Sequence, residues 1–180
     1  AVHIHDEDPS HDDALAIATA LAAAIKPMTY DVIFTSNKGT DSDRGLVGAM
    51  LAEKLGLPYV GLVSGLEVED EGKTLRCTRD VEGGQRETIK VTLPAVICAQ
   101  KGLREPRYAS LMNIMQAKKK PMETKTVADL GVDTGEAVKL EVEKMEYPPQ
   151  RPPGRLVDGG SVDEKVKELV RLLKEEAKVL

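Results

Sequence analysis

A strand, a polar loop, a helix and a second strand follow one another in residues 30–64, which read YDVIFTSNKGTDSDRGLVGAMLAEKLGLPYVGLVS. Tyr30–Ser36 is continuously apolar in its middle, as expected for a strand buried in a parallel sheet. Gly45–Leu55 has the pattern of a helix, which Gly56 ends. Tyr59–Ser64 is again a buried strand. This order is typical of a βαβ unit and predicts an α/β fold with a parallel sheet.

The pattern changes after residue 64. Gly65–Glu71, Thr74–Arg79 and Arg86–Thr92 combine alternation with charge, which predicts an antiparallel meander. Pro94–Ala99 returns to an apolar run and predicts another buried strand. We expect Cys98 in this run to be a small buried thiol, because two cysteines in 180 residues do not make a disulfide framework.

Further elements are expected on both sides of this centre. They are a strand at Val2–His5, helices at Asp12–Ile25 and Tyr108–Lys118, an edge strand at Val138–Met145 and a terminal helix at Val162–Leu180. In the first helix we expect Asp12 or Asp13 as the N-cap and an apolar face of Leu15, Ile17, Leu21 and Ile25.

The C-terminal part is expected to differ from the core. Residues 148–160 contain four prolines and three glycines, which predicts an extended arm. Ser161 and Glu164 predict a capping box at the start of the terminal helix. We therefore expect an α/β domain in residues 1–147 and a C-terminal arm and helix in residues 148–180.

Composition and charge argue against some classes of function. The net charge of −5 argues against nucleic acid as the main partner. No apolar run approaches the roughly 20 residues of a membrane span. No signal peptide is visible, and we expect a cytoplasmic location, or the mitochondrial matrix in a eukaryote. The chain opens in a strand-like alternation without an initiator Met, so we expect its natural N-terminal part to be missing.

The loop between the first buried strand and its helix is a candidate phosphate site. A helix start there exposes the backbone N–H groups of Gly45, Leu46 and Val47, which favour an anion. We expect Asp41 or Asp43 to cap the helix while Arg44 offers charge to the ligand. The alternative is a capped helix with no ligand, because glycine loops before helices are common.

Two other polar clusters can be explained either by a functional site or by an ordinary solvent-exposed structure. His3 and His5 share one face of a strand near His11 and several aspartates, Asp6, Asp8, Asp12 and Asp13. No further ligand has a fitting spacing, so a solvated strand end is favoured over a metal site. Residues 79–84 are either a hairpin turn with exposed charges or an ion-pair anchor to another subunit.

The helix within residues 101–120 has more apolar positions than one face can bury. These positions are Leu111, Met112, Ile114 and Met115. One of them is expected to project as a knob for a partner's pocket. The alternative interpretation is an ordinary buried helix face. Lys118, Lys119 and Lys120 form a solvated last turn, which could also steer an acidic partner.

Four sequence blocks resemble the electron-transfer flavoprotein beta subunit. The first is Arg79-x-x-Glu82-Gly83-Gly84-x-x-Glu87-x-Ile89 followed, after four residues, by Pro94-Ala95-Val96-Ile97-Cys98. The second is Glu105-Pro106-Arg107-Tyr108 with Leu111, Ile114, Met115 and the lysines after them. The third is the loop Asp41–Gly48 with Met50-Leu51-Ala52-Glu53 and Leu55-Gly56-Leu57-Pro58. The fourth is Ser161-Val162-Asp163-Glu164.

The resemblance implies a Rossmann-like parallel sheet of the adenine nucleotide alpha-hydrolase-like type, and it implies that the missing N-terminal part includes the first strands of this fold. It implies pairing with an alpha subunit that holds most of an FAD, which takes electrons from acyl-CoA or related dehydrogenases and passes them to a quinone reductase in fatty acid oxidation. It also implies that this subunit binds AMP in a structural role, as an electron carrier without a catalytic residue or metal of its own.

The resemblance assigns residues to these roles. The AMP loop is expected to use Ser36, Asn37, Lys38, Gly39, Asp41, Asp43, Arg44, Gly45, Leu46 and Val47. Partner recognition is expected from Arg107, Tyr108, Leu111, Asn113, Ile114 and Met115, with Leu111 as the anchor for the dehydrogenase. Asp80 matches an acidic residue that contacts the alpha subunit.

The sequence departs from the family pattern at two positions. Leu46 stands where the family often has Gln, so a side-chain amide contact is lost and Arg44 is the expected replacement. Cys77 stands where Ile, Val, Ala or Gly is usual. Two alternatives stay open: a bifurcating relative with a second FAD in the AMP site, and a stand-alone nucleotide-binding regulator. An enzyme with its own active site ranks last, since no nucleophile–base arrangement is found.

Overall fold

The computed structural model describes residues 1–7, 13–140, 143–151 and 153–179. It divides into two compact units, Ala1–Glu141 and Val142–Leu180. The predicted boundary after residue 147 lies a little beyond this division and stays a prediction. Throughout the described ranges, every helix is too short or too polar to cross a bilayer.

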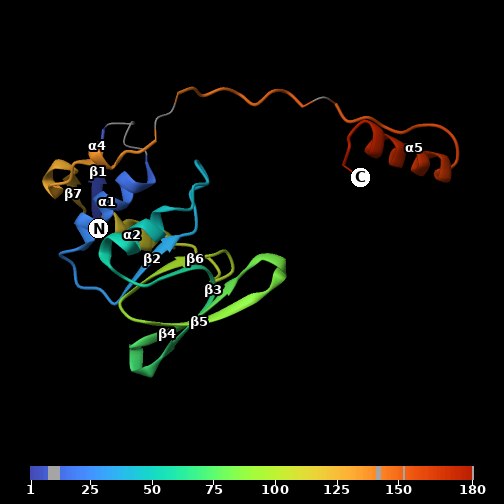
Figure 1. Cartoon of the computed structure of the whole chain (residues 1–180). Helices are drawn as coiled ribbons and strands as arrows, with labels where there is room; N and C mark the ends of the chain where they lie inside the picture. Colours follow the sequence, from blue (N-terminus) through green and yellow to red (C-terminus); the bar gives the residue numbers. More distant parts are fainter. Residues whose placement is uncertain (8–12, 141–142, 152, 180) are drawn as a thin grey trace. The chain divides into compact units, whose positions relative to one another are not determined.

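A five-stranded mixed sheet forms the centre of the first unit (Figure 1). Its strand order is β2 (Val32–Ser36), β6 (Ala95–Ala99), β3 (Tyr59–Glu69), β4 (Thr74–Asp80) and β5 (Arg86–Thr92). The first three strands run parallel, and β4 and β5 continue the sheet as an antiparallel meander. The short 3-10 turns Asp70–Gly72 and Glu82–Gly84 connect the meander strands. The predicted parallel sheet and meander are both confirmed.

One strand belongs to both parts of the sheet. The sequence predicts separate strands before and after residue 64, whereas β3 is continuous. Its register against β6 shifts between Val60 and Val63, and its register against β4 shifts between Val63 and Gly65. Leu62, within this irregular part, has φ of 58°. The irregularity carries β3 from its parallel partner to its antiparallel one.

Helices α1 (Ala14–Ile25) and α2 (Val47–Leu55) pack together beside β2. Ala18, Ala22 and Leu51 form the buried centre of this contact, and Ile33 of β2 packs against it. The apolar face predicted for α1 is wrong in part, because the helix buries six of its seven alanines while Ile17 is 37% exposed. Small alanine side chains let neighbouring helices approach closely.

A second core cluster lies among the strands and is aliphatic, as the low aromatic content of 3% predicts. Its buried members are Val60, Val63, Leu75, Cys77, Val91, Ala95 and Ile97. Each fully buried Val, Leu or Ile side chain contributes roughly 1.5–3 kcal/mol relative to exposure. This cluster fixes the strands from whose ends the polar loops project.

A separate two-stranded parallel sheet joins β1 (Val2–His5) to β7 (Glu123–Thr126). The strand at the chain start is therefore confirmed, but its partner was not predicted. The 3-10 turn Ala128–Leu130 and the short helix α4 (Thr134–Ala137) follow β7.

The edge strand predicted at Val138–Met145 is wrong, because its described residues form no strand. The backbone N–H of Lys139 instead donates to a carboxylate oxygen of Asp13 at 3.2 Å. The side chain of Asp13, at the start of α1, therefore accepts a backbone hydrogen bond that in a strand would be donated to a neighbouring strand.

The second unit contains helix α5 (Val162–Glu175) and the extended chain before it. The predicted capping box is confirmed: the backbone N–H of Ser161 donates to Glu164 at 2.7 Å, and the N–H of Glu164 donates to the Ser161 hydroxyl at 3.4 Å. The helix ends at Glu175, before the predicted end. None of its described residues is buried.

Candidate functional site

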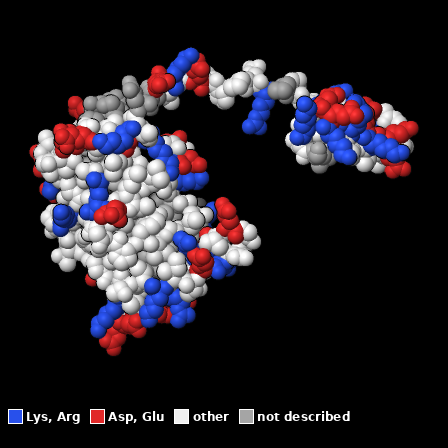
Figure 2. Space-filling view, viewed as in Figure 1, with Lys and Arg blue, Asp and Glu red and all other residues white. Residues whose placement is uncertain are grey.

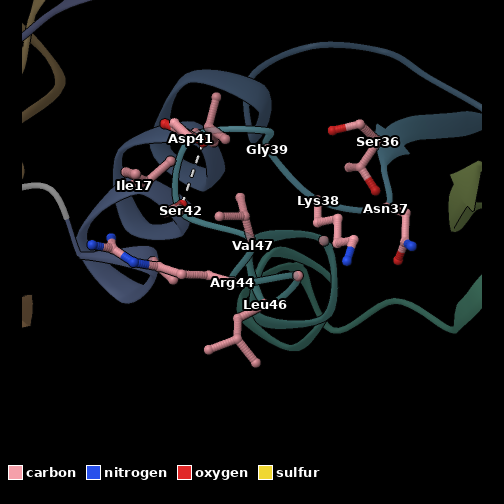
Figure 3. A pocket seen from close by; sticks show the side chains of 15 residues that line it. Ile17, Ser36, Asn37, Lys38, Gly39, Asp41, Ser42, Arg44, Leu46 and Val47 are labelled. Atoms are coloured by element: carbon pink, nitrogen blue, oxygen red, sulfur yellow. Dashed lines mark hydrogen bonds between the residues drawn. The ribbon is translucent and has the colours of Figure 1, made fainter. Parts of the chain in front are cut away.

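A cavity of about 300 Å³ lies where the carboxyl end of β2 leads through a loop to the start of α2 (Figure 3). Ligands of open parallel sheets bind beyond the carboxyl ends of the strands. Nine of the ten residues predicted for the AMP loop line the cavity: Ser36, Asn37, Lys38, Gly39, Asp41, Arg44, Gly45, Leu46 and Val47. Its volume is at the lower end of the range for small-molecule sites.

Helix α1 supplies a wall of the cavity that sequence reasoning missed. Ala14, Ile17 and Leu21 line it, together with Thr35, Ser42 and Gly48 from β2, the loop and α2. Figure 3 shows Ile17 beside Asp41 and Ser42. The sequence carried a signal for Thr35, since it is a polar residue directly after the apolar run of β2. It carried no signal for Ile17, which fits an ordinary buried face equally well.

The start of α2 is open to an anion. Its N-cap residue is Leu46, whose side chain makes no capping hydrogen bond. The first backbone hydrogen bond of the helix runs from the N–H of Met50 to the carbonyl of Leu46 at 3.1 Å. The backbone N–H groups that come before Met50, in the first turn of α2, therefore have no acceptor within the helix and can donate to an anion.

The predicted aspartate cap of α2 is wrong, because both aspartates are engaged elsewhere. Asp43 does not line the cavity and forms an ion pair with Lys38 at 2.5 Å. Asp41 accepts a hydrogen bond from the Ser42 hydroxyl at 3.4 Å. Backbone N–H groups, first that of Ser42, hold the pKa of Asp41 below its usual value.

The cations of the loop balance these carboxylates. Backbone N–H groups are the main cause that lowers the pKa of both Asp41 and the buried Asp13, and the charge of Arg44, which lines the cavity, adds a smaller contribution. Lys38 lines the cavity as well, and its side chain is 49% exposed. Lys38 and Arg44 can each donate to a negatively charged ligand, in competition with the nearby carboxylates of Asp41 and Asp43.

One buried hydroxyl near the cavity has no partner. In the part of the chain that the structure describes, Thr35 Oγ1 is the one buried side-chain nitrogen or oxygen without a hydrogen bond. It lies beside the first turn of α2, where a Cβ on Gly48 would be 2.6 Å from it. Glycine at this position lets the open helix end approach β2 closely. Cavity size, the open helix start and this hydroxyl together suit a small anionic ligand such as a phosphate group.

Residues at the end of β6 and directly after it hold the start of the loop that follows β2. The thiol of Cys98, which is 1% exposed, donates to the carbonyl of Ser36 at 3.4 Å. The Asn37 amide donates to Gln100 Oε1 at 3.0 Å. Burial, followed by a hydrogen bond with Cys98, raises the pKa of Tyr59. The predicted buried thiol is confirmed, and it lies directly under the loop.

The segment predicted for partner recognition is exposed. Helix α3 (Leu111–Ala117) is shorter than predicted, and its N-cap is Ser110, whose hydroxyl accepts from the N–H of Asn113 at 3.3 Å. All six predicted recognition residues are exposed, and Leu111 is 75% exposed. The alternative of a buried helix face is wrong, since no residue of α3 is buried.

The hairpin between β4 and β5 pairs its own charges. Asp80 contacts Arg86 at 3.0 Å, and Arg79 contacts Glu87 at 2.8 Å. These pairs are cross-strand neighbours in the register of the two strands. The hairpin turn predicted with exposed charges is confirmed, whereas a contact of Asp80 with another subunit stays a prediction.

Charged side chains of both signs are mixed on the surface. Figure 2 shows them around the edges of the first unit and over α5. His5 contacts Glu7 at 3.3 Å, and the rings of His3 and His5 are 5.9 Å apart. The described ranges contain no group of three metal-ligating side chains. The other acidic and histidine residues considered with them, at positions 8, 11 and 12, lie outside the described residues.

Comparison with known proteins gives one family. Residues 1–130 match the electron transfer flavoprotein domain. "Electron transfer flavoprotein subunit beta" of Bacillus subtilis (strain 168) is 40% identical over 176 residues, which cover 97% of this chain and 67% of that protein. The protein of the same name from Bradyrhizobium diazoefficiens is 42% identical over 168 residues, covering 93% and 63%. That of Homo sapiens is 39% identical over 161 residues, covering 89% and 59%.

The chain thus spans about two thirds of the length of the bacterial relatives. Its match to the domain covers the sheet, the cavity and α3. The fold and the sequence comparisons agree with the resemblance read from the four blocks. The chain belongs to the electron transfer flavoprotein family and groups there with the beta subunits.

Proposed function

We propose that this chain is the electron-carrier subunit that pairs with an electron transfer flavoprotein alpha subunit and binds AMP in the loop of residues 36–47. The observation that carries the proposal is the open start of α2 at the wall of a cavity, in a chain with this family membership. The AMP phosphate would accept hydrogen bonds from the first turn of α2, with Arg44 and Lys38 balancing its charge.

The nucleotide has a structural role in this proposal. It ties the end of β2 to α1 and α2, since all three elements line the cavity. FAD, shared with and mostly held by the alpha subunit, supplies the redox chemistry when bound. This chain contributes the shape that positions the partner and the surface that docks the dehydrogenase. A quinone reductase is the proposed electron acceptor.

Two exposed apolar surfaces support the need for partners. Helix α5 exposes Val162, Val166, Leu169 and Val170 without any buried residue of its own. Helix α3 exposes Leu111 and its neighbours in the same way. Uncovered apolar side chains on a helix are typical of an interaction surface. We assign α5 to the alpha subunit and Leu111 to an acyl-CoA or related dehydrogenase.

Co-purification with the alpha subunit tests the assignment. Gel filtration is expected to give a heterodimer, and its visible spectrum is expected to correspond to one flavin per heterodimer. Two flavins would favour the bifurcating alternative, in which FAD occupies the AMP site. The cavity volume of about 300 Å³ favours AMP over that larger ligand. A chain that stays monomeric beside the alpha subunit would contradict the proposal and favour a stand-alone regulator.

A further inference from the structure

The loop that forms the cavity wall is held from outside the cavity by the side chain of Gln100, the residue that follows β6. Asn37 lines the cavity, and its Nδ2 donates to Gln100 Oε1 at 3.0 Å. Gln100 follows β6 directly and does not line the cavity. The two residues are 63 positions apart, so this bond joins segments that only the parallel pairing of β2 and β6 brings together.

Asn37 connects this bond to the start of α2. Its carbonyl oxygen lies next to Gly45, where an added Cβ would be 3.5 Å away. Gly45 has φ of 63° and begins the approach to the open helix end. Gln100 is itself fixed, because its backbone N–H donates to the carbonyl of Val63 at 2.9 Å. A shift of Asn37 would therefore move one wall of the cavity relative to the phosphate-binding turn.

A second contact supports Asn37 from Cys98, near the end of β6. The Cys98 thiol lies 3.9 Å from Asn37 Oδ1 and 3.4 Å from the carbonyl of Ser36. Thiols are weak donors, so the stronger restraint on the side chain is the amide bond to Gln100. The side chains of Asn37 and Gln100 are partly buried, and losing a hydrogen-bond partner costs more free energy there than at the surface.

We propose that Gln100 is a positioning residue for nucleotide binding, acting through the Asn37 amide to hold the cavity wall in its ligand-accepting shape. The inference rests on the proposed function, since AMP is the ligand it concerns. A loop held in advance binds more tightly because its ordering cost is not met at the moment of binding.

Titration calorimetry with AMP tests this, using the full chain in complex with its alpha subunit after removal of bound nucleotide. Gln100→Leu is expected to weaken AMP binding about fivefold, the range of one net hydrogen bond. Gln100→Glu keeps an acceptor for Asn37 and is expected to bind within about twofold of the wild type. Gln85→Leu, at an exposed position on the β4–β5 hairpin, is the matched control and should bind as the wild type does.

A double-mutant cycle separates positioning from a general structural effect. Once Asn37→Ala has removed the partner, adding Gln100→Leu should change the AMP affinity no further. Additive losses in the double variant would overturn the inference, and so would equal weakening by Gln100→Glu and Gln100→Leu. If the wild type binds AMP and Gln100→Leu binds it equally well, the inference fails while the proposed function stands. If the wild type binds no AMP, the proposed nucleotide site fails as well.

Discussion

At the residue scale, the contact between Gly48 and Thr35 limits what the nucleotide loop tolerates. Gly48 lies in a helix, where replacing glycine by alanine ordinarily stabilises by roughly 0.5–1 kcal/mol. Here the added Cβ would be 2.6 Å from Thr35 Oγ1 and 3.4 Å from a carbon of the Tyr59 ring. The local packing therefore reverses the usual sign of this substitution.

Gly48→Ala is expected to lower the free energy of unfolding by about 1–3 kcal/mol, as overpacking does. Urea denaturation measures the change. Combining it with Thr35→Ala removes the clashing oxygen and should restore most of the loss. A Gly48→Ala protein as stable as the wild type would show that α2 moves away from β2 without cost.

Asp13 gives the second prediction at this scale. Burial tends to raise its pKa, but the N–H groups of Leu15, Lys139 and Ala16, with Arg44, together hold the pKa below the usual value of 3.8. A carboxylate with a lowered folded pKa stabilises the fold above the unfolded pKa, and this stabilisation is lost as the pH falls through the folded pKa. Asp13 thus ties α1 to the segment after α4 in its ionised form.

Asp13→Asn is expected to destabilise the protein at pH 7, and the difference from the wild type should narrow below about pH 4. Urea denaturation from pH 7 to pH 3 measures it. A difference that stays constant over this range would mean that the charge of Asp13 contributes nothing.

At the scale of elements, helix α3 has an exposed leucine that its own unit does not need. Leu111→Ala should change the free energy of unfolding by less than about 0.5 kcal/mol, as expected for an exposed side chain. Electron transfer from the partner dehydrogenase should fall at least tenfold, if Leu111 is the anchor of the docking surface.

Stopped-flow flavin reduction and chemical denaturation give the two readouts for Leu111. Leu156→Ala is a matched control, since this leucine is also exposed, at 85%, but belongs to the second unit. Loss of stability with unchanged coupling would show that Leu111 serves the fold.

The elements that the sequence predicted well are those in which pattern and packing agree. The apolar run of β6 is buried in the sheet as predicted, and Gly56 ends α2 with φ of 66°. The burial predicted for β2 is wrong, because β2 is an edge strand without a buried residue and Phe34 is 54% exposed. The strand predicted after α4 was wrong, because an alternating pattern indicates a half-buried face but does not show which strand would pair with it. β7 was missed for the opposite reason, since ETKT has no apolar residue to mark it.

The candidate site also has parts that the sequence could predict and parts that it could not. The loop of residues 36–47 could be located because a polar segment joins an apolar strand to a helix. The cap of α2 could not be predicted, because the choice of Lys38 as the partner of Asp43 depends on how the loop folds back. Ile17 and Gln100 reach the site only through tertiary packing, which local pattern does not contain.

At the scale of the whole molecule, the two units differ in how they are stabilised. The first has a sheet with two core clusters, whereas α5 in the second has no buried residue. Introducing charge on the apolar side of α5 should therefore leave the first unit stable. It should weaken pairing with the alpha subunit, because a charge buried without a partner is costly.

Val166→Asp with Leu169→Asp is expected to reduce affinity for the alpha subunit at least tenfold, measured by surface plasmon resonance. Lys167→Asp is the control, since it changes the net charge by the same two units without touching an apolar residue. Equal loss in both variants would indicate long-range repulsion, and no loss in either would remove α5 from the subunit interface.

The central claim is that this chain holds an adenine nucleotide for structural reasons while its partner holds the redox group. The most direct measurement is the chromatographic identification of nucleotides released when the purified complex with the alpha subunit is denatured. The account predicts one AMP and one FAD per heterodimer. Release of FAD alone, at one per heterodimer with no other adenine nucleotide, would contradict it.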